Sequence, residues 1–162
     1  MCLHIDNITF KRKKAKKDIK VLKVLFVTTD ITNIENRVYE SPIHKTLWKL
    51  GQTRTISKSE EGRRKGFIIE KGYYHSYKAD DHMKKWVNAS NLIFNRLVFE
   101  ATIPKGTWYY EGYHSDCLSG YASKSLRIDK LLDCEHNRRY MEHFKRIGIM
   151  KEVKMNIEIK ED

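Results

Sequence analysis

Residues 19–29 read IKVLKVLFVTT, a stretch with apolar residues on both faces of an extended strand. Alternate side chains of a β-strand point to opposite faces of the sheet. Both sets are apolar here: Leu22, Val24 and Phe26 on one face, and Val21, Leu25 and Val27 on the other. That pattern is typical of a central strand covered on both sides. The stretch therefore predicts a sheet that has this strand in its interior.

Further strands and two helices are predicted on the C-terminal side of this strand. Strand patterns cover GFIIEKGYYHSY (residues 66–77), LIFNRLVFEATIP (residues 92–104), TWYYEG (residues 107–112) and residues 153–160. A short helical face is formed by Ala79, Met83, Trp86 and Val87, and a second helical stripe by Tyr140, Phe144 and Ile147, ended by Gly148. We expect a single α+β domain, with a mixed or mostly antiparallel sheet and two or three helices.

Positive charge is the strongest global feature of the 162-residue chain, whose formal net charge is +11. Residues 11–17 read KRKKAKK, with six basic residues in seven positions: Lys11, Arg12, Lys13, Lys14, Lys16 and Lys17. Arg63 and Arg64 form a smaller basic patch. A basic run can neutralise phosphates and release their counterions. We expect a basic N-terminal arm over residues 1–17, a domain over residues 18–162 and a polyanionic ligand; a merely solvated basic surface is the alternative.

Several classes of protein and site find no support in the sequence. No apolar run is long enough to span a membrane, and the N-terminus lacks the order of a signal peptide. Three sparse cysteines favour free thiols in a reducing compartment, so we expect a cytoplasmic protein. The pairs His114 with Cys117 and Cys134 with His136 are the candidates for a metal site, but their spacing is unusual for zinc, and we expect no metal. No phosphate-binding loop or nucleophile elbow is present.

Two aromatic clusters, GYYHSY (residues 72–77) and WYYEGYH (residues 108–114), are candidates for a ligand site. Strand alternation places Tyr73, His75 and Tyr77 on one face, and Trp108 and Tyr110 on one face of the later strand. Tyrosine and tryptophan beside lysines can stack a base and bind a phosphate. The same residue types are also ordinary, half-buried strand formers. We expect these five residues to line a ligand site.

The segments KGYYHSYKADDHMKKW and NRLVFEATIPKGTWYYEG resemble part of the ADP-ribosyltransferase fold. The resemblance implies that Tyr73 and Tyr74 flank a nicotinamide pocket, that NAD is the cofactor, and that Glu111 or Glu135 is the catalytic glutamate. The chain departs from that family in the early strand KVLKVLFVT, which has no Arg or His where the family places its NAD-binding residue.

Most of the chain also resembles small bacteriophage and prophage proteins. The shared pattern is AKKDIKVLKVL, SP, GYYHSY, IPKGTWYYEG and GYAS. This likeness implies an accessory role in host takeover or anti-defence, but it carries no biochemical activity.

Three functions follow from these features. The first is a non-enzymatic protein, without a cofactor, that binds nucleic acid or a phosphorylated nucleotide. The second is an ADP-ribosyltransferase-like enzyme that uses NAD, with Glu111 as its glutamate. The third is an inhibitor that docks its basic face on an acidic or nucleic-acid-binding protein.

Overall fold

A computed structural model of the chain describes residues 3–5, 11–27, 39–40, 47–57, 68–69, 72–89, 96–115 and 117–146. Four expectations concern residues outside these ranges: the final strand over residues 153–160, the helix end at Ile147 and Gly148, the basic pair Arg63 and Arg64, and the thiol of Cys2.

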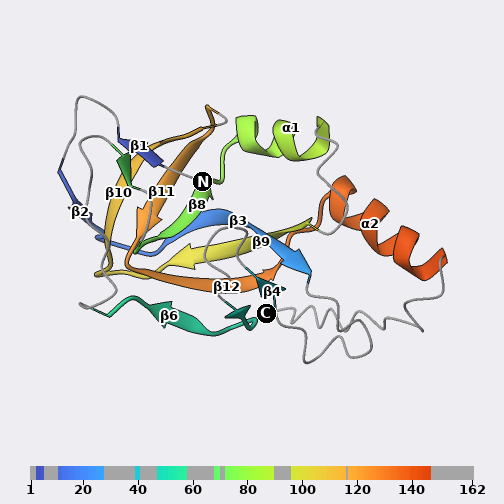
Figure 1. The fold of residues 1–162 in the computed structure, drawn as a ribbon, viewed down its shortest axis with the longest axis horizontal. Coiled ribbons are helices and arrows are strands. Elements are labelled where there is room, and N and C mark those ends of the chain that lie inside the picture. The colour runs from blue at the N-terminus through green and yellow to red at the C-terminus, as the bar shows by residue number, and fades with distance from the viewer. Residues whose placement is uncertain are drawn as a thin grey trace, which may run out of the picture.

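The described strands form an antiparallel sheet with the order β6-β12-β9-β3-β8-β11-β10-β1-β7 (Figure 1). The strands are β1 (Leu3–Ile5), β2 (Lys13–Lys14), β3 (Ile19–Val27), β4 (Tyr39–Glu40), β5 (Leu47–Trp48), β6 (Thr53–Thr55), β7 (Ile68–Ile69), β8 (Tyr74–Lys78), β9 (Arg96–Ile103), β10 (Trp108–His114), β11 (Ser119–Ser123) and β12 (Ser125–Leu131). The helices are α1 (Asp81–Ala89) and α2 (Glu135–Arg146). The α+β class and the mostly antiparallel sheet are confirmed.

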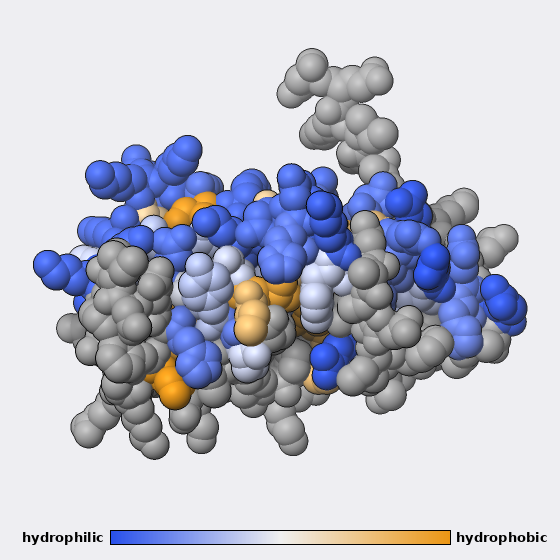
Figure 2. Space-filling model, turned by 90° about the horizontal axis from the view of Figure 1, so that it is seen from above, coloured by the Kyte–Doolittle hydropathy of each residue, from blue (hydrophilic) through white to orange (hydrophobic). Residues whose placement is uncertain are grey.

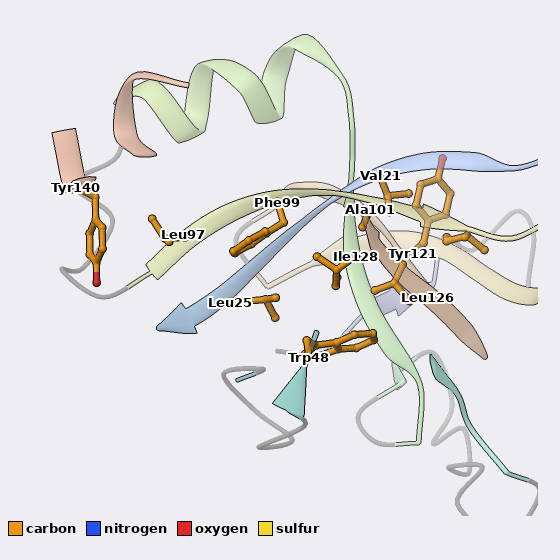
Figure 3. Packing of buried hydrophobic residues seen from close by; sticks show 11 residues of the cluster. Val21, Leu25, Trp48, Leu97, Phe99, Ala101, Tyr121, Leu126, Ile128 and Tyr140 are labelled. Atoms are coloured by element: carbon orange, nitrogen blue, oxygen red, sulfur yellow. The ribbon is translucent and has the colours of Figure 1, made fainter. Parts of the chain in front are cut away.

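Strand β3 is central, as its apolar pattern predicts. It pairs with β9 from Ile19 opposite Ile103 to Phe26 opposite Arg96, and with β8 on its other side. Its two faces contribute to two separate hydrophobic clusters. Val21 and Leu25 join the cluster of Trp48, Phe99 and Ile128, which lies on the side of the sheet away from α1 (Figure 3).

Helix α1 covers the opposite face, where it contributes Met83 and Val87 to the cluster that contains Leu22 and Val24. Both of these α1 side chains are buried, as their helical spacing predicts. The helix begins after Asp80, whose carboxylate accepts a hydrogen bond of 2.9 Å from the Met83 backbone N–H and so caps the first turn. Ala79, which we expected on the apolar face, precedes the helix and is exposed.

The N-terminal residues take part in the same sheet as the rest of the chain. Strand β1 pairs with the end of β10, where Leu3 lies opposite His114, and β2 pairs with its beginning, where Lys14 lies opposite Trp108. Parts of the predicted N-terminal arm, residues 1–17, therefore belong to the sheet, because both short strands pair with β10. Within the described residues, no helix is long and apolar enough to cross a membrane.

Candidate functional site

The basic run of residues 11–17 is fixed to the sheet at the β9–β10 turn. The Ala15 N–H donates to the Thr107 carbonyl at 2.9 Å, and the Gly106 N–H donates to the Ala15 carbonyl at 2.8 Å. The small Ala15 side chain is buried, whereas the cations on either side of it are exposed. Gly106 has a φ of 85°, which a turn can adopt at low cost only with glycine. The basic run is thus held to the β9–β10 turn at Ala15, its one apolar residue.

Trp108, the first residue of β10, lies against two cations of this run. The Arg12 guanidinium carbon is 4.6 Å from the centre of the Trp108 ring, and the Lys14 ammonium is 5.8 Å from it. These distances are those of cation–π interactions. Trp108 is 37% exposed, and Lys11, Lys16, Lys17 and Lys105 are exposed as well. We call residues 11–17 together with Lys105 and Trp108 the basic edge.

Lys13, in the basic run, binds the carboxylate of Glu111. Its ammonium donates to Glu111 Oε2 at 2.8 Å, and the Lys78 ammonium lies 3.6 Å from Glu111 Oε1. Burial by itself would raise the pKa of Glu111, but the hydrogen bond and charge of Lys13, with a smaller effect of Lys78, outweigh it and lower that pKa. The hydrogen bond to Glu111 in turn raises the pKa of Lys13. Glu111 is therefore an ionised carboxylate whose two oxygens both pair with lysines.

The predicted ligand face of β8 is packed inside the protein. Tyr73, His75 and Tyr77 are only 4%, 4% and 3% exposed. The Tyr73 ring meets the edge of Tyr110 with 5.5 Å between centres, and Tyr77 contacts His114 at 4.6 Å. The structure thus divides these residues between two packed groups: Tyr73 with the partly buried Tyr110, and His75 and Tyr77 with His114. Of the five predicted ligand residues, Trp108 is the one classed as exposed.

Sequence reasoning missed the buried residues Lys23 and Gly120, and it considered buried His114 only as a metal candidate. The Lys23 ammonium donates to the His75 carbonyl, and burial lowers the pKa of Lys23 to about 8. His114 Nε2 donates to the Ser76 carbonyl at 2.9 Å. Lys23 had a usable signal, because it interrupts an apolar strand; the partners of His114 and Gly120 come from other strands and leave no local pattern.

The candidate metal and catalytic residues are dispersed among structural contacts. His136 Nε2 donates to the Arg96 carbonyl at 2.8 Å, and Glu135 pairs with Arg139 one turn along α2. Cys117 is exposed in a turn, and Cys134 is buried. In the part of the chain that the structure describes, no group of three or more His, Cys, Asp or Glu residues could hold a metal ion.

Most of the coloured surface in Figure 2 belongs to hydrophilic residues, with small areas of hydrophobic ones. Among the described residues, the basic edge combines exposed cations with an exposed aromatic ring, so it is the candidate site. Comparison of the chain with protein-family models, with curated proteins and with solved structures found no match.

Proposed function

We propose that this protein is a non-enzymatic binding protein for polyanions, with nucleic acid as the ligand class. One observation carries the proposal: the Trp108 ring lies against Arg12 and Lys14. These two cations belong to a basic run whose backbone is hydrogen-bonded to the sheet. Because the backbone that carries these cations is already fixed, only their side chains lose conformational freedom when they contact phosphates. Each phosphate they neutralise releases counterions, which is the main source of such affinity.

The charge of the whole chain acts in the same direction. A net charge of +11 attracts a polyanion over a distance of about a Debye length, roughly 8–10 Å at moderate salt. Asp18 is the acidic residue next to the run, and its carboxylate accepts the Lys105 backbone N–H at 2.8 Å. That carboxylate therefore helps to hold the turn in place. The long-range field and the local geometry together favour binding at the basic edge.

The transferase alternative would place Glu111 against NAD. Both Glu111 oxygens pair with Lys13 and Lys78, so the carboxylate would have to leave these lysines before it could bind a sugar hydroxyl. A test for NAD consumption by the purified protein, with and without cell lysate, decides this alternative. Turnover that Glu111→Gln abolishes would replace the binding proposal with an enzymatic one.

The experiment for the binding proposal compares two double variants of equal charge change. R12Q/K14Q removes two cations of the basic edge, and K84Q/K85Q removes two exposed cations of α1 as a matched control. Affinity for a labelled DNA duplex is measured by fluorescence anisotropy over a series of salt concentrations. We expect R12Q/K14Q to reduce the slope of log affinity against log salt by about 1.8, because each phosphate contact contributes about 0.9.

The control variant should leave most of that slope in place. Equal slopes for the two variants would contradict the proposal, because the positive charge would then act without a defined surface. If the partner is instead an acidic protein, a protein should remain bound after nuclease treatment of the lysate. The affinity for DNA should then be negligible.

A further inference from the structure

We infer that the basic edge binds single-stranded nucleic acid and stacks one base on Trp108. This inference rests on the proposed function and names the ligand class of the same surface. It starts from the exposure of Trp108, which is 37% even with the Arg12 guanidinium 4.6 Å from its ring centre. An aromatic ring beside cations is the arrangement that sequence-tolerant single-strand binders use, because every base has a stackable face.

The backbone that carries Trp108 is held from two sides. Lys14 lies opposite Trp108 in the β2–β10 ladder, and the Lys124 N–H donates to the Trp108 carbonyl at 3.0 Å. The next residue, Tyr109, pairs with Ser123 of β11. The ring therefore projects from a strand whose position is set before any ligand arrives, so stacking a base on it orders little of the protein.

The two cations beside the ring are spaced to contact the backbone on either side of a stacked base. Arg12 lies two residues before Lys14, the last residue of β2, so their Cα atoms are at most about 6.8 Å apart. Both cations approach the same Trp108 ring, and Lys14 is paired with Trp108 across the β2–β10 ladder. An extended single strand can place a base on the ring and present neighbouring phosphates to these two cations.

The phosphates of a duplex can contact the cations of the basic edge, but its bases cannot stack on the Trp108 ring. Its bases are stacked inside the helix, and extruding one costs unstacking and unpairing energy. The contribution of Trp108 should therefore appear with single strands and be absent both with duplex DNA and with a polyanion that has no bases. This difference separates base stacking from charge attraction.

The test uses Trp108→Leu, with Tyr113→Leu as its matched control. Tyr113 is also an exposed aromatic residue of β10, at the end of the strand away from β2. Affinities of the full-length chain are measured for a short mixed-sequence single strand, for the same sequence as a duplex, and for heparin. We expect Trp108→Leu to weaken single-strand binding about tenfold, the loss expected for one stacked base, and to leave the other two ligands nearly unchanged. Tyr113→Leu should change none of the three.

Two failures are distinguishable. Base stacking is overturned if Trp108→Leu weakens the binding of all three ligands equally, or of none of them. The basic edge can still bind polyanions in that case. The proposed function itself is overturned if R12Q/K14Q and K84Q/K85Q have the same affinities for all three ligands. Thermal unfolding of each variant shows whether the fold is retained, and Trp108→Phe, which keeps an aromatic face, should recover part of the single-strand affinity.

Discussion

Lys23 is a cation inside the central strand, and its side chain is only 6% exposed. Its ammonium donates to the His75 carbonyl, and burial lowers its pKa from 10.5 to about 8. An unfolded chain keeps this proton up to about pH 10.5, whereas the folded chain loses it near pH 8. Between these values the unfolded state binds more protons, so the free energy of unfolding must rise with pH.

The pH window from about 8 to 10.5 therefore yields a prediction for Lys23→Met, which keeps the length of the side chain without its charge. Below this window the variant should be more stable than the wild type, by up to roughly 3 kcal/mol. The gap should close as the pH rises through the window. Urea unfolding of both proteins at a series of pH values measures this difference in the free energy of unfolding. Burial also raises the pKa of Tyr121, to about 12, but Tyr121 is present in both proteins and its effect cancels in the difference. A gap that does not change with pH would contradict the burial of a charged Lys23.

Gly120 shows why the packing around these residues could not be predicted from the sequence. A Cβ at this position would lie 2.1 Å from His114 Nε2 and 2.6 Å from the Ser76 carbonyl oxygen. Only a glycine leaves room for the His114 ring to reach across the sheet to that carbonyl. The requirement arises where β8 lies beside β11 and the end of β10, and β8 is distant from both in the sequence, so no local pattern predicts it. The alternation of GYYHSY assigned faces to its residues but could not tell a packed face from an open one.

Asn137 connects helix α2 to the sheet at the point where β12 ends. Its Oδ1 accepts the Val98 backbone N–H at 3.0 Å, and its Nδ2 donates to the carbonyls of Val98 and Leu132 at 2.7 Å each. The amide thus continues the hydrogen-bond ladder of β9 past Leu131, the last residue of β12. Asn137 is 2% exposed, so water cannot replace these bonds.

The prediction for this element is that Asn137→Ala lowers the free energy of unfolding by roughly 1–3 kcal/mol, because it leaves the buried Val98 backbone N–H without its partner. Arg138→Ala is the control. Arg138 is exposed, and its contact with Asp133 is 3.5 Å long, so the change should cost less than about 0.5 kcal/mol. Chemical denaturation of both variants measures the difference. Similar losses for the two would mean that the Asn137 amide does not hold α2 to the sheet.

The elements that could be predicted are those with a strong local period. Strand β3 and helix α1 have one, and the structure places both close to their predicted ranges. Strands β1 and β2 are only three and two residues long, and they depend on pairing with β10 about a hundred positions away. The basic run was visible in the sequence, but its attachment beside Trp108 was not. The candidate site therefore required the long-range pairing.

At the scale of the whole molecule, a net charge of +11 opposes folding through self-repulsion, which a bound polyanion relieves. A ligand that prefers the folded state stabilises it by mass action, by about 2.7 kcal/mol at a hundredfold excess over Kd. For a chain of this size that corresponds to a rise in Tm of roughly 5–10 °C. We expect a single-stranded oligonucleotide to raise the Tm, and R12Q/K14Q to lose most of this rise while K84Q/K85Q keeps it. The unfolded chain carries the same charges without the fixed geometry, so an oligonucleotide that lowers the Tm would show that it binds the disordered cations better than the basic edge.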